Sequence, residues 1–186
     1  MTIRLAHAKI NLALVVGPVQ DAGKHEVVTV LQRVALADTI ELSAGTGLTV
    51  DGFTDDTIVR EALARLATVA SLEPHWAVRI TKQIPVSAGL GGGSSDAAAA
   101  LLLANQSLES PLTLERLSVI AAEIGADVPF FLHDGPQLGT GDGSHCPLEM
   151  EASVHPTAIS DARRAWSTVG PSSFSAKPRT DCMPPA

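Results

Sequence analysis

The pattern of apolar and polar residues predicts β-strands in the first part of the chain. Between residues 10 and 16 every second residue is apolar, whereas Lys9 and Asn11 fall on the opposite side of the same extended segment. Further runs of Val, Ile, Leu and Thr predict strands on either side of Asp38, where the pattern breaks, and residues 17–25 are expected to form a turn-rich link. A meander or a set of hairpins is the simplest arrangement. The predicted strands are residues 10–16, 27–37, 39–42 and 48–50.

The middle of the chain changes to helical spacing. Residues 57–70 and 112–124 carry apolar side chains three and four positions apart, and Gly125 is expected to end the second of these helices. Between them, residues 76–84 alternate again and predict a strand that leads into a glycine-rich stretch. The sequence therefore predicts an α+β fold.

The chain is organised around that glycine-rich stretch, Pro-Val-Ser-Ala-Gly-Leu-Gly-Gly-Gly-Ser-Ser-Asp at residues 85–96. Its glycines remove Cβ atoms at a sharp bend and allow an anion to approach the backbone. The alanine and leucine block that follows predicts a helix through Leu103, with Ser94 or Ser95 as its N-cap and Asp96 in its first turn. Because the first amides of a helix have no internal partners, we expect them to bind phosphate oxygens. A glycine-rich turn without a ligand is the alternative.

Two common nucleotide-binding fingerprints do not fit this stretch. Ser94 stands where the dinucleotide-binding pattern requires its third glycine, and no lysine follows the last glycine as it does in the Walker pattern. The glycine loop is therefore expected to bind phosphates in another structural context.

Composition narrows the function classes. The 186 residues suffice for one domain of ordinary size, and 13 basic against 20 acidic residues give a net charge of −7, which argues against nonspecific nucleic-acid binding. The two cysteines are too few for a disulfide scaffold, and no apolar run reaches the roughly 20 residues that span a bilayer. The sequence favours a cytoplasmic protein without membrane or nucleic-acid partners.

Three segments, in the same order along the chain, resemble the GHMP kinases, which phosphorylate small-molecule alcohols. They are Pro-Val-Ser-Ala-Gly-Leu-Gly-Gly-Gly-Ser-Ser-Asp-Ala-Ala from residue 85, Ala-Lys-Ile-Asn-Leu from residue 8, and Gly-Ala-Asp-Val-Pro-Phe-Phe from residue 125. The resemblance implies the N-terminal domain of these kinases, which is similar to domain 2 of ribosomal protein S5. It also implies that ATP binds to Pro85, Val86, Ser87, Ala88, Gly89, Leu90, Gly91, Gly92, Gly93, Ser94 and Ser95.

Within the family, the segments are most similar to kinases that phosphorylate the 2-hydroxyl of a cytidine diphosphate-linked methylerythritol in the non-mevalonate isoprenoid pathway. The resemblance makes Lys9 and Asp127 catalytic and assigns Asn11 and His25 to this small-molecule substrate. Without it, Lys9 is a surface lysine, His25 a loop histidine and Asp127 the N-cap of a short helix. Mg²⁺ is expected for charge neutralisation, with Ser95 or Asp96 as open candidates for its ligand.

The resemblance stops near residue 143, and residues 144–186 contain half of the twelve prolines without a sustained period. We expect residues 1–143 to form the ATP-binding and catalytic domain, residues 144–186 to form a disordered tail, and the second kinase domain to be absent. A frameshift near Ser144 is one hypothesis for this ending.

Two alternatives to the methylerythritol kinase follow. A catalytically inactive nucleotide-binding fragment would bind ATP without turnover. Another GHMP kinase, acting on mevalonate, homoserine or a sugar, fits the segments at residues 8 and 125 less well.

Overall fold

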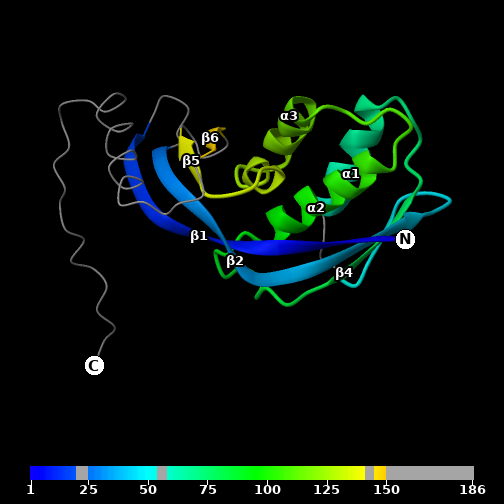
Figure 1. Cartoon of the computed structure of the whole chain (residues 1–186), viewed down its shortest axis with the longest axis horizontal. Helices are drawn as coiled ribbons and strands as arrows, with labels where there is room; N and C mark the ends of the chain where they lie inside the picture. Colours follow the sequence, from blue (N-terminus) through cyan, green and yellow to red (C-terminus); the bar gives the residue numbers. More distant parts are fainter. Residues whose placement is uncertain (20–24, 54–57, 141–144, 150–186) are drawn as a thin grey trace.

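The computed structural model describes residues 1–19, 25–53, 58–140 and 145–149. Strands form one mixed sheet, and Figure 1 shows the helices gathered over one of its faces. The strands follow the order β3-β4-β2-β5-β6, and β1 pairs with β2. The bounds are β1 Thr2–Val19, β2 His25–Ala44, β3 Thr49–Asp51, α1 Ile58–Val69, β4 Trp76–Thr81, α2 Gly92–Gln106, α3 Leu114–Ile124, the 3₁₀ helix η1 Pro129–Leu132, β5 Gln137–Thr140 and β6 His145–Glu149.

The two longest strands, β1 and β2, pair in antiparallel register along most of their length. The predicted break at Asp38 is wrong, because β2 runs through this residue without interruption and Asp38 is fully buried. The predicted link is also shorter than expected, since β1 extends to Val19 and β2 begins at His25; residues 20–24 lie outside the described part of the chain. The polar residue in this apolar run therefore does not mark a turn. Asp38 is a buried strand residue.

The connection of the next strands differs from the predicted meander. β3 pairs with β4 in parallel, and α1 forms the crossover between them. β4 then pairs with β2 in antiparallel register, from Thr39 opposite Thr81 to Ala44 opposite Trp76. Strand β4 therefore brings the chain to the glycine loop from the interior of the sheet.

The structure corrects the expected disorder from residue 144 onwards. Residues 145–149 form β6, which pairs with β5 and extends the sheet. The remainder of the expected tail, residues 150–186, lies outside the described residues.

The core lies between the sheet and the helices. Nearly every residue of α2 from Ser95 to Asn105 is buried, and its alanines allow close packing against the sheet and α1. On the opposite face, β1 displays an exposed row of apolar side chains: Ile3, Leu5, Ile10, Leu12, Leu14 and Val16. Within the described residues, no helix combines the length and apolar character needed to cross a membrane.

Candidate active site

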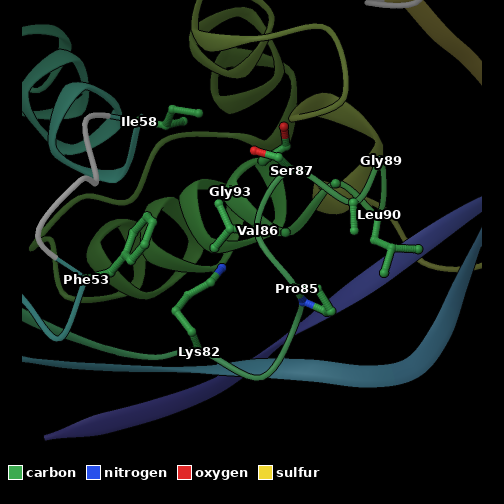
Figure 2. A pocket seen from close by; sticks show the side chains of 13 residues that line it. Phe53, Ile58, Lys82, Pro85, Val86, Ser87, Gly89, Leu90 and Gly93 are labelled. Atoms are coloured by element: carbon green, nitrogen blue, oxygen red, sulfur yellow. The ribbon is translucent and has the colours of Figure 1, made fainter.

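The glycine loop between β4 and α2 encloses a cavity of about 390 Å³. Residues 85–94 line it together with Phe53, Ile58 and Lys82. Figure 2 shows Phe53 and Lys82 on one side of the cavity and Gly89 and Leu90 on the other. The structure thus gathers ten of the eleven predicted ATP-binding residues around one cavity.

Helix α2 begins earlier than predicted. Gly91 is the N-cap, with φ 70° and ψ 20°, and no side chain caps the helix, so neither Ser94 nor Ser95 is the cap. The first helical bond joins the amide of Ser95 to the carbonyl of Gly91. The amides of Gly92, Gly93 and Ser94 therefore precede the helical hydrogen-bond pattern, which is the arrangement that binds phosphate oxygens.

Two glycines are required by close contacts. A Cβ on Gly91 would lie 2.9 Å from Cγ of Lys9 and 3.1 Å from the Phe131 ring, and a Cβ on Gly92 would lie 3.1 Å from Ile84. In addition, the amide of Lys9 donates to the carbonyl of Leu90 over 2.9 Å. The absent side chains thus allow the loop to contact β1 directly.

Lys9 and Asp127, 118 positions apart in the sequence, meet beside this loop. Lys9 Nζ lies 3.3 Å from Asp127 Oδ2 and donates to Asn11 Oδ1 over 3.0 Å. Asn11 Nδ2 in turn donates to Thr29 Oγ1 over 2.7 Å, which fixes the orientation of the amide. Lys9 is buried and the Asp127 side chain is 35% exposed, so the carboxylate remains accessible to a ligand.

A register shift in the β1–β2 ladder explains why Lys9 faces the helices. Ala6 and Ala8 are buried, but after the shift between His7 and Lys9 the even-numbered residues from Ile10 to Val16 are exposed, while Lys9 is buried. Such irregularities redirect a side chain within a strand. The shift turns Lys9 away from solvent and towards Asp127.

Three further predictions concern the cap role of Asp127, the ATP-binding role of Ser95 and the substrate-binding role of His25. Asp127 is not an N-cap, because Val128 occupies that position of η1. Ser95 is buried and lines a second cavity, of about 280 Å³, together with Arg4, His7 and Arg33 instead of the first one. The side chain of His25 lies outside the described part of the structure.

Sequence reasoning missed a buried charge cluster below the loop. Lys82 Nζ donates to Asp38 Oδ2 over 2.5 Å and to Asp96 Oδ2 over 2.7 Å. Asp96 lies in the second turn of α2, not in its first turn. Burial raises the pKa of Asp96 to about 7, against the opposing effect of Lys82. The only sequence signal of this cluster was the carboxylate of Asp38 within an apolar strand pattern.

Asp38 receives the strongest set of donors in this cluster. Its Oδ1 accepts the backbone amides of Gln83 over 2.5 Å and of Ile84 over 2.8 Å. Burial alone would raise the pKa of Asp38, but the hydrogen bonds from Lys82 and from these amides outweigh it and lower that pKa. Of the two carboxyl groups in the cluster, Asp38 is therefore the one that ionises at the lower pH.

The candidates for a magnesium ligand do not form a magnesium site. Among the described residues no group of three or more His, Cys, Asp or Glu side chains comes together. Asp96 is buried with Lys82, and Ser95 opens onto the second cavity, so neither lines the loop cavity.

Comparison with known proteins first identifies the class. Residues 56–135 match the family model described as GHMP kinases N terminal domain. Together with the mixed sheet and the glycine loop, this match shows that the chain contains a GHMP kinase N-terminal domain. Methanococcus jannaschii mevalonate kinase, with a TM-score of 0.61 and 13% identity over 81% of this chain and 56% of its own, shares the fold.

The particular relatives are 4-diphosphocytidyl-2-C-methyl-D-erythritol kinases. The Nocardia farcinica kinase is 43% identical over 74% of this chain and 48% of its own length, and the Rhodococcus jostii kinase is 37% identical over 81% and 51%. A crystal structure of 4-(cytidine 5'-diphospho)-2C-methyl-D-erythritol kinase matches with a TM-score of 0.71 and 31% identity, over 85% of this chain and 62% of its own. The chain spans about half the length of the curated relatives it matches.

Proposed function

We propose that this chain transfers the γ-phosphoryl group of ATP to the 2-hydroxyl of 4-diphosphocytidyl-2-C-methyl-D-erythritol. The observation that carries the proposal is the 3.3 Å contact between Lys9 and Asp127 beside the glycine loop. Its substrate comes from the name of the relatives, and its chemistry from the loop, the ammonium and the carboxylate.

In this proposal the loop holds the phosphates. The amides of Gly92, Gly93 and Ser94 belong to the first turn of α2, where the helix dipole favours negative charge. Phe53 and Ile58 provide an apolar wall for the remainder of the nucleotide. Phosphoryl transfer depends mainly on positioning and charge stabilisation, which this arrangement supplies.

Asp127 acts as the base in the transfer. The proton of the substrate hydroxyl passes to the Asp127 carboxylate while the hydroxyl oxygen forms a bond to the γ-phosphorus and the bond from that phosphorus to the β-phosphate oxygen breaks, releasing ADP. Lys9 stabilises the negative charge that develops, and Asn11 keeps the Lys9 ammonium in place through its 3.0 Å hydrogen bond. Asn11 and His25 are the proposed substrate-binding residues.

The test is an ADP-release assay with the cytidine substrate on wild type and Asp127→Asn. The variant keeps the shape of the side chain but cannot take the proton, and we expect turnover to fall by about 100-fold or more while ATP binding persists. Asp134→Asn is the matched control, since Asp134 is exposed and pairs with Arg33. Equal turnover in Asp127→Asn and wild type would refute the role of the carboxylate.

The alternative is a nucleotide-binding fragment without activity. ATP binding without turnover in the wild-type chain would support this alternative. Turnover with mevalonate or homoserine and not with the cytidine substrate would assign the chain to another member of the family.

A further inference from the structure

The glycine loop makes few packing contacts that could fix its position. Residues 85–89 are all exposed, so few packing contacts fix them. At its far end the loop is held where the carbonyl of Leu90 accepts the amide of Lys9. At its near end, the segment Lys82–Ile84 approaches the loop directly from β4, and the contacts of this segment decide where the loop begins.

Those contacts converge on Asp38. One carboxylate oxygen accepts the amides of Gln83 and Ile84, and the other accepts Lys82 Nζ. Asp38 lies in the middle of β2, where Ala6 of β1 is its partner, so the strand that carries it is held on both sides. A charged acceptor bound to two amides is stronger and more directional than a neutral one.

Lys82 extends the connection to helix α2. Its ammonium bridges Asp38 and Asp96, and Gly92 leaves room for it, because a Cβ there would lie 3.3 Å from Lys82 Nζ. The buried Oδ1 of Asp96 has no partner in the described structure, so Asp96 contributes one bond to the cluster whereas Asp38 contributes three. The cluster thus joins the strand before the loop to the helix after it.

Stability alone does not account for such a cluster. Well-packed apolar residues in place of a buried ion pair are often as stable or more stable, because the charges lose their hydration. Buried ionic groups can instead specify a single arrangement of the elements that they join. Here the joined elements are the two that flank the loop cavity, which Lys82 itself lines.

We propose that Asp38 is a positioning residue for nucleotide binding, which holds the entry of the glycine loop through Gln83, Ile84 and Lys82. The proposal rests on the proposed function only for the identity of the nucleotide. Asp38 does not line the loop cavity, so it acts through the loop and not by contact with the ligand. Asp96, which accepts a single hydrogen bond from Lys82, is not required to hold the entry of the loop.

The test compares two substitutions of the same kind, Asp38→Asn and Asp96→Asn, in the full chain. In Asp38→Asn the carboxylate that holds Lys82 becomes an amide, and we expect faster hydrogen exchange at residues 82–90 and about tenfold weaker binding of ATP. In Asp96→Asn an oxygen remains to accept from Lys82 and the Asp38 bonds are untouched, so loop exchange and ATP affinity stay within about twofold of wild type. Equal losses in both variants, or unchanged affinity in Asp38→Asn, would overturn the proposal.

A measurement on the wild-type chain keeps the test informative if Asp38→Asn does not fold. Without nucleotide, the amides of Gln83 and Ile84 should exchange much more slowly than the exposed loop amides that follow them, although Gln83 is itself exposed. Exchange as fast as in residues 86–89 would refute the hydrogen bonds to Asp38. Wild-type chain that binds ATP but does not turn over refutes the kinase proposal and leaves the role of Asp38 standing.

Discussion

Two glycines of the loop allow the contact between loop and β1 to be measured separately from backbone strain. Gly89 and Gly91 have nearly the same positive φ, 74° and 70°, but nothing lies within 4 Å of a Cβ on Gly89, whereas a Cβ on Gly91 meets Lys9 at 2.9 Å. Placing alanine at such a φ costs about 1–2 kcal/mol. The stiffer unfolded chain offsets about 0.4–1 kcal/mol of this. Gly89→Ala should therefore destabilise by about 1 kcal/mol.

Gly91→Ala carries the same strain and a further packing term. The new methyl group must displace Cγ of Lys9, near the base of that side chain, and the ring of Phe131 at 3.1 Å. Overpacking of this kind costs about 1–3 kcal/mol, so the total destabilisation should be about 2–4 kcal/mol. The displaced Lys9 should also move from Asp127, and turnover should fall more than in Gly89→Ala.

Urea unfolding of wild type, Gly89→Ala and Gly91→Ala, followed by circular dichroism, tests this difference. The slopes of the three transitions should agree, so that the midpoints report stability. If Gly91→Ala is no less stable than Gly89→Ala, Gly91 does not contact Lys9 and the close approach of the loop to β1 is refuted.

Two further predictions concern buried polar groups. The pKa of Asp96 is raised to about 7 in the folded chain, against about 3.9 in the unfolded chain. Between these two pH values the folded state keeps a proton that the unfolded state releases. The free energy of unfolding therefore falls as the pH rises from about 4 to about 7. Asp96→Asn removes this fall. In urea unfolding the variant should gain about 2–3 kcal/mol of stability on wild type between about pH 5 and about pH 8, and an unchanged difference would contradict the assigned titration. Ser107→Ala removes the acceptor of the buried Trp76 Nε1, now 2.9 Å away, and should cost about 1–3 kcal/mol in thermal unfolding; a variant as stable as wild type would show that Trp76 finds another acceptor.

Local patterns predicted the elements well where one face is buried. The alternation of Trp76, Val78 and Ile80 corresponds to β4, in which these three residues are buried, and the helical spacing before Gly125 corresponds to α3. The boundaries were less accurate, since β4 ends at Thr81 and not at residue 84. The segment after Thr81 leaves the sheet because its amides bond to a carboxylate instead of a neighbouring strand.

The errors have a common physical cause. A lone aspartate in a strand pattern indicates a turn when its partners are unknown, because an unpaired buried carboxylate is unfavourable. Asp38 remains inside β2 only because Lys82 and two amides, more than forty residues away, satisfy it. Likewise, serines are common N-caps, but the left-handed conformation of Gly91 begins α2 before them. Long-range contacts of this kind have no local sequence signature.

Lys9 makes the two parts of the proposed site interdependent. Its amide holds the loop at Leu90, its aliphatic stem packs where Gly91 has no side chain, and its ammonium contacts Asp127. The loop amides that we propose bind the phosphates therefore move together with the ammonium when β1 moves. A site built in this way keeps a constant distance between the bound phosphates and the base, which in-line transfer requires. The same coupling implies that Lys9→Met, which keeps the amide and much of the stem, should retain ATP binding while turnover is lost; loss of both would show that the ammonium, and not the backbone contact, places the loop.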